Sequence, residues 1–167
     1  MEEKNLTIPE IFSNVVIKFP QNIALQVKRD AYWQRFTYSD LENWAQKLAT
    51  FLIKEGYKER NFAAILLENR PEWPIIYLGL MYAGLACVPL DPQTSPEELR
   101  NLIIDSTAKL IFCSYDIFAK KLKPSIQEPS IKIILLFQFS KLGINLKRFR
   151  NIDSNQEFAV LYGNLSC

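Results

Sequence analysis

The sequence contains no histidine among its 167 residues. Without an imidazole, this chain can build neither a Ser-His-Asp triad nor a Cys-His pair, and it lacks the commonest neutral metal ligand. Its three cysteines, Cys87, Cys113 and Cys167, are far apart and have no Cys-x-x-Cys spacing. The cysteine pattern therefore supports neither a disulfide framework nor a structural zinc site, and it predicts a reducing, cytoplasmic location.

A large excess of charge of one sign is also missing. The 20 Lys and Arg residues nearly balance the 18 Asp and Glu residues, so the net charge is +2. This balance gives no global field to attract a polyanion, and we expect no nucleic-acid partner. Basic residues gather at 120–123 and 141–150, where they could touch an anionic phosphate or a membrane surface. The competing interpretation is an ordinary solvated helix face and loop.

Helix starts are marked by the Ser/Thr-x-x-Glu capping box, in which a hydroxyl and a carboxylate satisfy free backbone amides. We predict boxes at Thr7 with Glu10, at Ser39 with Glu42, and at Ser95 with Glu98. A fourth helix is predicted to start at Pro71, with Asn69 nearby to accept backbone amides. Gly56 and Gly84 are placed to end two of these helices. The uncharged run 73–90 is broken by proline and glycine, so we predict a helix, a turn and a strand there rather than a membrane span.

Short apolar runs rich in β-branched residues alternate with these helices, an order that favours a mainly parallel sheet covered on both faces. The predicted fold class is therefore α/β, with a Rossmann-like sheet flanked by helices. We expect a single domain over 1–167, with a loosely held segment over 115–157. The first strand could instead pair with Tyr32–Thr37 as a peripheral hairpin. The predicted strands are Ile23–Val27, Phe62–Leu67, Ala86–Val88, Lys109–Cys113, Ile131–Phe137 and Phe158–Leu161.

One ordered set of motifs carries a family resemblance. Asn69-Arg70-Pro71-Glu72-Trp73 opens an apolar helix, and Val88-Pro89-Leu90-Asp91-Pro92 leads to Ser95-Pro96-Glu97-Glu98-Leu99. This order resembles the start of the AMP-forming acyl-CoA synthetases, which activate a carboxylic acid with ATP and then pass the acyl group to a thiol. The resemblance implies the incomplete N-terminal subdomain of the adenylate-forming ligase fold. Tyr32-Trp33 and the turn at Pro71 look most like the fatty-acid branch.

The resemblance also implies what the complete enzyme would use, namely a fatty acid, ATP, Mg and coenzyme A. Family members follow a strand ending in Tyr or Phe with a Thr/Ser/Gly-rich loop and Pro-Lys-Gly, which wraps the ATP phosphates. Phe158–Tyr162 resembles that strand, whereas Gly163–Cys167 contains no lysine. We therefore expect an N-terminal fragment of a fatty acid–CoA ligase that is inactive alone, and we assign no catalytic, cofactor-binding or metal-binding residue within Met1 to Cys167.

Two alternatives stay open at this point. The Val-Pro-Leu-Asp-Pro motif is also typical of peptide-synthetase adenylation domains, so the chain could be a fragment of one. The chain could also be a non-catalytic interaction module that pairs with a full-length relative through its unfinished sheet. An exposed parallel sheet edge near Phe158–Leu161 would favour such pairing or self-association. Because the complete family fold packs apolar faces of this region against later segments, we expect surplus exposed apolar surface here, above all over Ile131–Phe139. A role for Asp91 in forming its turn, rather than in catalysis, is the preferred interpretation of that residue.

Overall fold

The structure is a computed structural model and describes residues 6–124, 131–136, 142–150 and 157–164. Contacts within it divide the chain into two compact units. Unit 1 comprises Met1–Lys58 and Arg70–Gly84, and unit 2 comprises Glu59–Asn69 and Leu85–Cys167. The expectations of a single domain over 1–167 and of a loosely held segment over 115–157 stay predictions.

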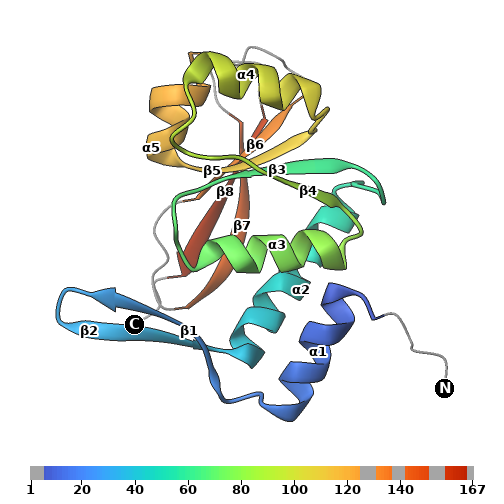
Figure 1. The fold of residues 1–167 in the computed structure, drawn as a ribbon, viewed down its shortest axis with the longest axis vertical. Helices are drawn as coiled ribbons and strands as arrows, with labels where there is room; N and C mark the ends of the chain where they lie inside the picture. Colours follow the sequence, from blue (N-terminus) through green and yellow to red (C-terminus); the bar gives the residue numbers. More distant parts are fainter. Residues whose placement is uncertain (1–5, 125–130, 137–141, 151–156, 165–167) are drawn as a thin grey trace. The chain divides into compact units, whose positions relative to one another are not determined.

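Unit 1 consists of three helices and a β-hairpin (Figure 1). The hairpin strands pair antiparallel, with Val27 opposite Gln34 and Arg29 opposite Tyr32, so the turn between them is Asp30-Ala31. The predicted peripheral hairpin is thereby confirmed. The elements of unit 1 are α1 (Ile8–Lys18), β1 (Ile23–Arg29), β2 (Tyr32–Thr37), α2 (Tyr38–Lys54) and α3 (Glu72–Tyr82).

Capping explains where two helices of unit 1 begin. At α1 the predicted box is present, since the Thr7 hydroxyl accepts from the Glu10 amide and the Glu10 carboxylate accepts from the Thr7 amide at 2.8 Å. The predicted box at Ser39 is wrong. Helix α2 starts two residues earlier, because Thr37 and Asp40 form the reciprocal pair of hydrogen bonds instead. An aspartate at the third helical position serves the same purpose as glutamate, and its shorter side chain reaches the cap amide at 2.9 Å.

A glycine lets α2 and α3 approach each other closely. A Cβ atom built on Gly79 would lie 2.8 Å from Leu48 Cδ2 and 3.1 Å from the carbonyl oxygen of Ala45. The apolar helix α3 buries residues around most of its circumference, including Ile75, Ile76 and Leu80. Helix α3 contacts α2 more than it contacts any other helix. The uncharged run in the sequence is therefore explained by burial of this helix in the core. Within the described part of the chain, no helix is both long and apolar enough to cross a lipid bilayer.

The helix ends also follow the sequence pattern. Gly56, just after α2, has φ of +86°, and Gly84, just after α3, has φ of +73°. Glycine is the residue that adopts this left-handed conformation at least cost. Helix α3 starts at Glu72, and Pro71 is the residue before it, with no side-chain hydrogen bond at that cap. Asn69 therefore does not have the capping role at Pro71 that we predicted for it.

Unit 2 is built on a six-stranded sheet with the order β4-β3-β5-β6-β8-β7. Among the described strands of this sheet, five run parallel, while β7 pairs antiparallel with β8. The predicted α/β class with a mainly parallel sheet is confirmed. The elements are β3 (Phe62–Leu66), β4 (Ala86–Pro89), α4 (Pro96–Asp105), β5 (Leu110–Ser114), α5 (Tyr115–Ile117), the π-helical turn η1 (Phe118–Leu122), β6 (Lys132–Leu136), β7 (Leu142–Arg150) and β8 (Glu157–Asn164).

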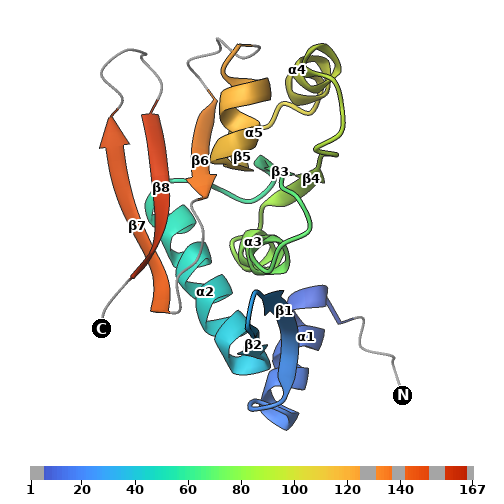
Figure 2. The same ribbon diagram turned by 90° about the vertical axis from the view of Figure 1, so that its left-hand side faces the viewer.

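Helices α4 and α5 lie side by side on one face of this sheet (Figure 2). A contiguous apolar cluster joins Leu66 of β3, Leu99 of α4, Ile111 of β5 and Leu122 of η1, each 0% exposed. Alternate residues of a strand point to the same face, so this cluster takes every second position of β3 and β5.

Two predictions about the later strands need correction. The exposed parallel edge expected at Phe158–Leu161 is wrong, because β8 lies inside the sheet, between β6 and β7. The expected exposure of Ile131–Phe139 is wrong for Ile131 and Ile133, which are 7% and 1% exposed and belong to the apolar cluster. Residues 137–139 lie outside the described residues. Strand β7 was not predicted at all, and it is this strand that covers the free side of β8.

Candidate functional site

The carboxyl ends of the parallel strands in unit 2 identify the region where a ligand would bind. Strand β3 comes first in the chain, β4 pairs on one side of it, and β5 pairs on the other. The direction of the strand order therefore reverses between β3 and β5. In open parallel sheets, ligands bind outside the carboxyl ends of the strands at such a reversal. We take this edge of the sheet as the candidate site.

Glu68 and Ser114 meet at this edge. Glu68 lies two residues beyond β3, and Ser114 is the last residue of β5. The Ser114 hydroxyl donates to Glu68 Oε1 at 3.1 Å, and it also caps α5 by accepting from the amide of Ile117, the last residue of that helix. Ser114 is 5% exposed, whereas Glu68 is exposed to solvent. The hydrogen bond therefore ties the end of β3 to the end of β5 and leaves a carboxylate at the surface of the candidate site.

Sequence reasoning missed both residues. Each follows a continuous apolar run that was itself predicted as a strand, over 62–67 and 109–113. The signal that could have found them is their position, because polar residues just after buried parallel strands collect at the ligand-binding edge. The strand order cannot be read from the sequence pattern, so that pattern could not show that these two strands are neighbours.

Cysteine chemistry is suppressed near this site. Burial raises the pKa of the Cys113 thiol, and the negative charge of Glu68 raises that pKa further. Burial raises the pKa of Cys87, on β4, to about 11. Both thiols are therefore protonated at neutral pH, and a thiol is a weak nucleophile compared with its thiolate. Cys113 is buried, as its interpretation as a core residue predicts, whereas Cys87 is half-buried. Cys167 lies outside the described residues.

The loop from β4 to α4 borders the same edge of the sheet. Asp91 Oδ1 accepts from the Gln93 amide at 2.8 Å, and the Asp91 carbonyl accepts from the Thr94 amide at 3.1 Å. The turn-forming role predicted for Asp91 is confirmed. Helix α4 then starts where predicted, but with only one half of the predicted box: the Ser95 hydroxyl accepts from the Glu98 amide at 3.2 Å.

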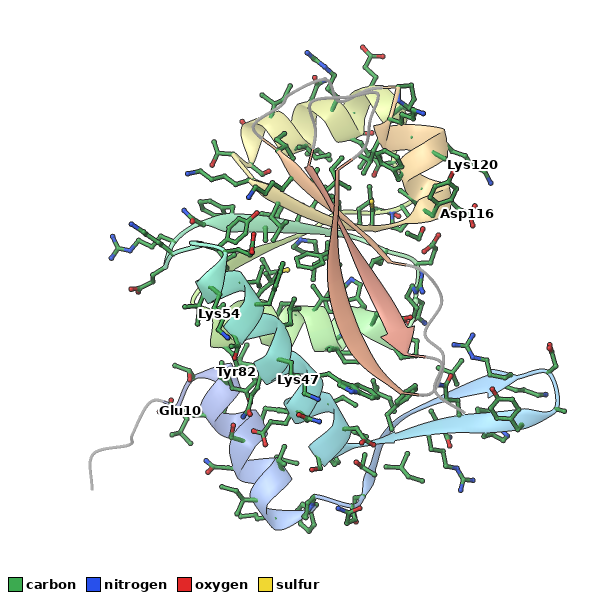
Figure 3. The ribbon with its side chains drawn as sticks, turned by 180° about the vertical axis from the view of Figure 1, so that it is seen from behind. Glu10, Lys47, Lys54, Tyr82, Asp116 and Lys120 are labelled. Carbon is green, nitrogen blue, oxygen red and sulfur yellow. The ribbon has the colours of Figure 1, made fainter. Side chains whose placement is uncertain are left out.

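A second polar cluster lies in unit 1, where all three helices meet. The Ser13 hydroxyl donates to Glu42 Oε1 at 2.7 Å and lies 2.9 Å from the Tyr82 hydroxyl, which donates to the same carboxylate oxygen at 3.2 Å. Figure 3 labels Tyr82 at the end of α3. Desolvation raises the pKa of Tyr82, and the Glu42 charge adds to that rise. The cluster joins α1, α2 and α3 and explains why Glu42 does not cap α2.

Sequence comparison with known families decides the ancestry of this chain. The profile of the family described as "AMP-binding enzyme" matches residues 12–157. The chain belongs to the AMP-binding enzyme family. The family match spans most of unit 1 and most of unit 2, including the whole of the candidate site.

Individual relatives of this family member are much larger proteins. A linear gramicidin synthase of Brevibacillus parabrevis is 36% identical over 108 residues, which cover 65% of this chain and 1% of that protein. The structure of Klebsiella oxytoca NpsA in complex with 3-hydroxyanthranilyl-AMSN matches with a TM-score of 0.66 and 21% identity, over 79% of this chain and 25% of that one. The fatty acyl-adenylate ligase from L. pneumophila, in complex with acyl adenylate and pyrophosphate, matches with a TM-score of 0.65 and 20% identity, over 76% of this chain and 22% of that one.

These two structures confirm the fold as that of the N-terminal part of adenylate-forming enzymes. ATP, which the family implies, does not fit the described side chains of the candidate site. At the reversal point these are a carboxylate and a hydroxyl, and a carboxylate repels a triphosphate. Within the described part of the chain, no group of three or more His, Cys, Asp or Glu side chains could hold a metal ion. The prediction that no residue here is catalytic, cofactor-binding or metal-binding stays a prediction.

Proposed function

We propose that this chain is the N-terminal part of an adenylation domain of the peptide-synthetase type. The observation that carries the proposal is the family match over residues 12–157, together with 36% identity to the linear gramicidin synthase. Such a domain joins the carboxylate of an amino acid or related acid to the AMP portion of ATP and releases pyrophosphate. The acyl group then passes to the thiol of a carrier protein, and AMP leaves.

In this proposal the described residues act as scaffold. They supply the carboxyl edge of the sheet at β3 and β5, held together by the hydrogen bond between Ser114 and Glu68. Groups that neutralise the ATP phosphates and hold Mg would come from other parts of the same polypeptide. The negative charge of Glu68 at this edge supports this division of roles, because a triphosphate needs cationic partners in its site.

A fatty acid ligase is the second candidate, and the motifs at Tyr32-Trp33 and Pro71 favour it, because they resemble the fatty-acid branch. The L. pneumophila fatty acyl-adenylate ligase shares the fold in this region, as NpsA does, so the fold does not separate the two candidates. The curated relative supports the peptide-synthetase alternative better than the fatty acid–CoA ligase that we first expected. Coenzyme A as the acceptor, peripheral membrane contact and a cytoplasmic location are likewise proposals for the second candidate.

Exchange of labelled pyrophosphate into ATP separates the two candidates. The assay is run with the longest polypeptide that the gene encodes, using the twenty amino acids, aryl acids such as anthranilate, and hexadecanoate. We expect exchange at least about tenfold above the acid-free blank with an amino or aryl acid, and blank values with hexadecanoate. Exchange that depends on hexadecanoate would instead establish the fatty acid ligase.

The scaffold role is tested with the 167-residue chain by itself. We expect no exchange above the blank with any acid, and no heat of binding when ATP and Mg are added in a calorimeter. Tight, magnesium-dependent binding of ATP by this chain would contradict the proposal that the phosphate-binding groups lie elsewhere.

A further inference from the structure

Lys121, a residue of η1, forms hydrogen bonds with the loop between β4 and α4. Its ammonium donates to the carbonyl oxygens of Pro92 and of Thr94, the latter at 2.9 Å. All three residues belong to unit 2. The sequence interpretation of the lysines at 120–123, as a cluster facing an anionic surface or solvent, does not describe this side chain.

The π-helical turn fixes the point from which Lys121 reaches. Phe118 and Leu122 anchor η1 in the apolar cluster, at 7% and 0% exposed. The Lys123 amide donates to the Phe118 carbonyl at 2.8 Å, which is the i to i+5 hydrogen bond of a π turn. Single π turns are uncommon and are often found at functional positions. The neighbouring Lys120 is exposed and points away from the unit (Figure 3).

The loop between β4 and α4 is also stabilised by hydrogen bonds that do not involve Lys121. Leu90 donates its amide to the Ile65 carbonyl at 2.9 Å, which ties the start of the loop to β3. Asp91 then accepts from the Gln93 and Thr94 amides. In these contacts the backbone amides of the loop are the donors, whereas Lys121 donates to carbonyl oxygens of the loop. An ammonium has three donors and forms charge-assisted hydrogen bonds, so it can gather two carbonyls at once.

We propose that Lys121 is the positioning residue of the loop Leu90–Ser95: its ammonium fixes the loop conformation at the carboxyl edge of the sheet. The loop follows β4, which is the neighbour of β3, so it borders the candidate site. The relevance of this loop to substrate binding rests on the proposed function. The two hydrogen bonds from Lys121 to the loop, which we call the clamp, do not depend on that function. Because its charge is used within the unit, Lys121 is not available as a ligand for an external phosphate.

Hydrogen exchange of the 167-residue chain, followed by NMR or at peptide resolution by mass spectrometry, tests the clamp. Lys121→Met keeps the length and apolar stem of the side chain but removes both charged hydrogen bonds. We expect the Gln93 and Thr94 amides to exchange at least about tenfold faster in this variant. Lys121→Arg retains a charged donor, and its exchange rates should stay within about threefold of the parent chain. Lys120→Met is the matched control and should change nothing.

Three results would overturn the proposal. One is unchanged exchange of Gln93 and Thr94 in Lys121→Met. Another is equal acceleration in Lys121→Met and Lys121→Arg, because charge would then be irrelevant. The last is an equal acceleration in the central strands β3 and β5, which would mean that Lys121 contributes only to general stability. None of these measurements depends on adenylation, so the clamp can fail while the proposed function stands, and the reverse.

Discussion

Unit 1 and unit 2 are stabilised by contacts of different range and chemistry. In unit 1, the Ser13–Glu42–Tyr82 cluster joins residues 29, 40 and 69 positions apart, and Gly79 allows two helices to touch. In unit 2, the strands and α4 bury one apolar cluster whose members follow the local hydrophobic pattern. The difference teaches that local pattern suffices to predict most strands of the sheet, whereas the helix packing depends on individual pairs of distant residues.

The largest expected effect comes from removing apolar volume in unit 2. Leu99 of α4 is 0% exposed within the apolar cluster. We expect Leu99→Ala to lower the free energy of unfolding by about 3 kcal/mol, through lost burial and the cavity left behind. Amides in β3 and β5 should then exchange about 100-fold faster. Leu102→Ala, at an exposed position of the same helix, is the control, and equal effects of the two variants would contradict this account of unit 2.

The same variant also shows whether the two units unfold together. All three tryptophans, Trp33, Trp44 and Trp73, belong to unit 1. Tryptophan fluorescence during urea unfolding therefore reports on unit 1, while hydrogen exchange in β3 and β5 reports on unit 2. If Leu99→Ala moves the fluorescence midpoint as well, the predicted single domain is supported. If only the exchange rates move, the two units unfold separately.

A smaller effect is expected from filling the contact between two helices of unit 1. Gly79→Ala places a methyl group against Leu48 and the Ala45 carbonyl. The clash should outweigh the better helix propensity of alanine and destabilise unit 1 by about 2 kcal/mol, measured by tryptophan fluorescence in urea. Gly56→Ala, where nothing lies within 4 Å but φ is +86°, should cost about 1 kcal/mol from backbone strain alone. Unchanged or raised stability in Gly79→Ala would show that α2 and α3 can separate freely.

The smallest expected effect concerns alkaline pH and unit 2. Burial and Glu68 raise the pKa of Cys113 above its ordinary value of 9.0, so the thiol ionises first in the unfolded chain. Its contribution to stability is fully present below about pH 9 and falls above it, by at most about 1.4 kcal/mol per pH unit. Circular dichroism during urea unfolding at pH 8, 9 and 10 measures this slope. Cys113→Ala and Cys87→Ala should each reduce it, because burial raises the pKa of both thiols, and identical slopes in all three chains would count against buried thiols.

Much of the fold follows from local chemistry in the sequence. The capping box at Thr7, the left-handed glycines and the apolar strand runs each involve residues within a few positions of one another. The Ser39 box was wrong because Thr37 and Asp40 offer a competing cap two residues earlier, and because Glu42 bonds instead to two distant hydroxyls. No local sequence feature shows that Glu42 bonds to these two distant hydroxyls. Tertiary contacts decided between two caps of similar quality.

The candidate site was less predictable than the fold. Glu68 and Ser114 become neighbours only through the strand order, which places β5 beside β3. Strand β7 did carry a signal that was missed, since Ile144-Asn145-Leu146-Lys147 alternates apolar and polar residues. Recognising it would have added a strand to the predicted sheet, although not its place in the strand order. Lys121 had no such signal, because its partners are backbone carbonyls, which any sequence provides.

The position of β7 has a consequence for how the protein is made. During synthesis Leu142–Arg150 leaves the ribosome before Glu157–Asn164, yet it pairs with that later strand in the sheet. A nascent chain can therefore assemble β3 to β6 early, while β7 waits without a partner until β8 emerges between them. For that interval the outer side of β6 offers unpaired backbone groups, and a chaperone or a neighbouring nascent chain would find its easiest target there.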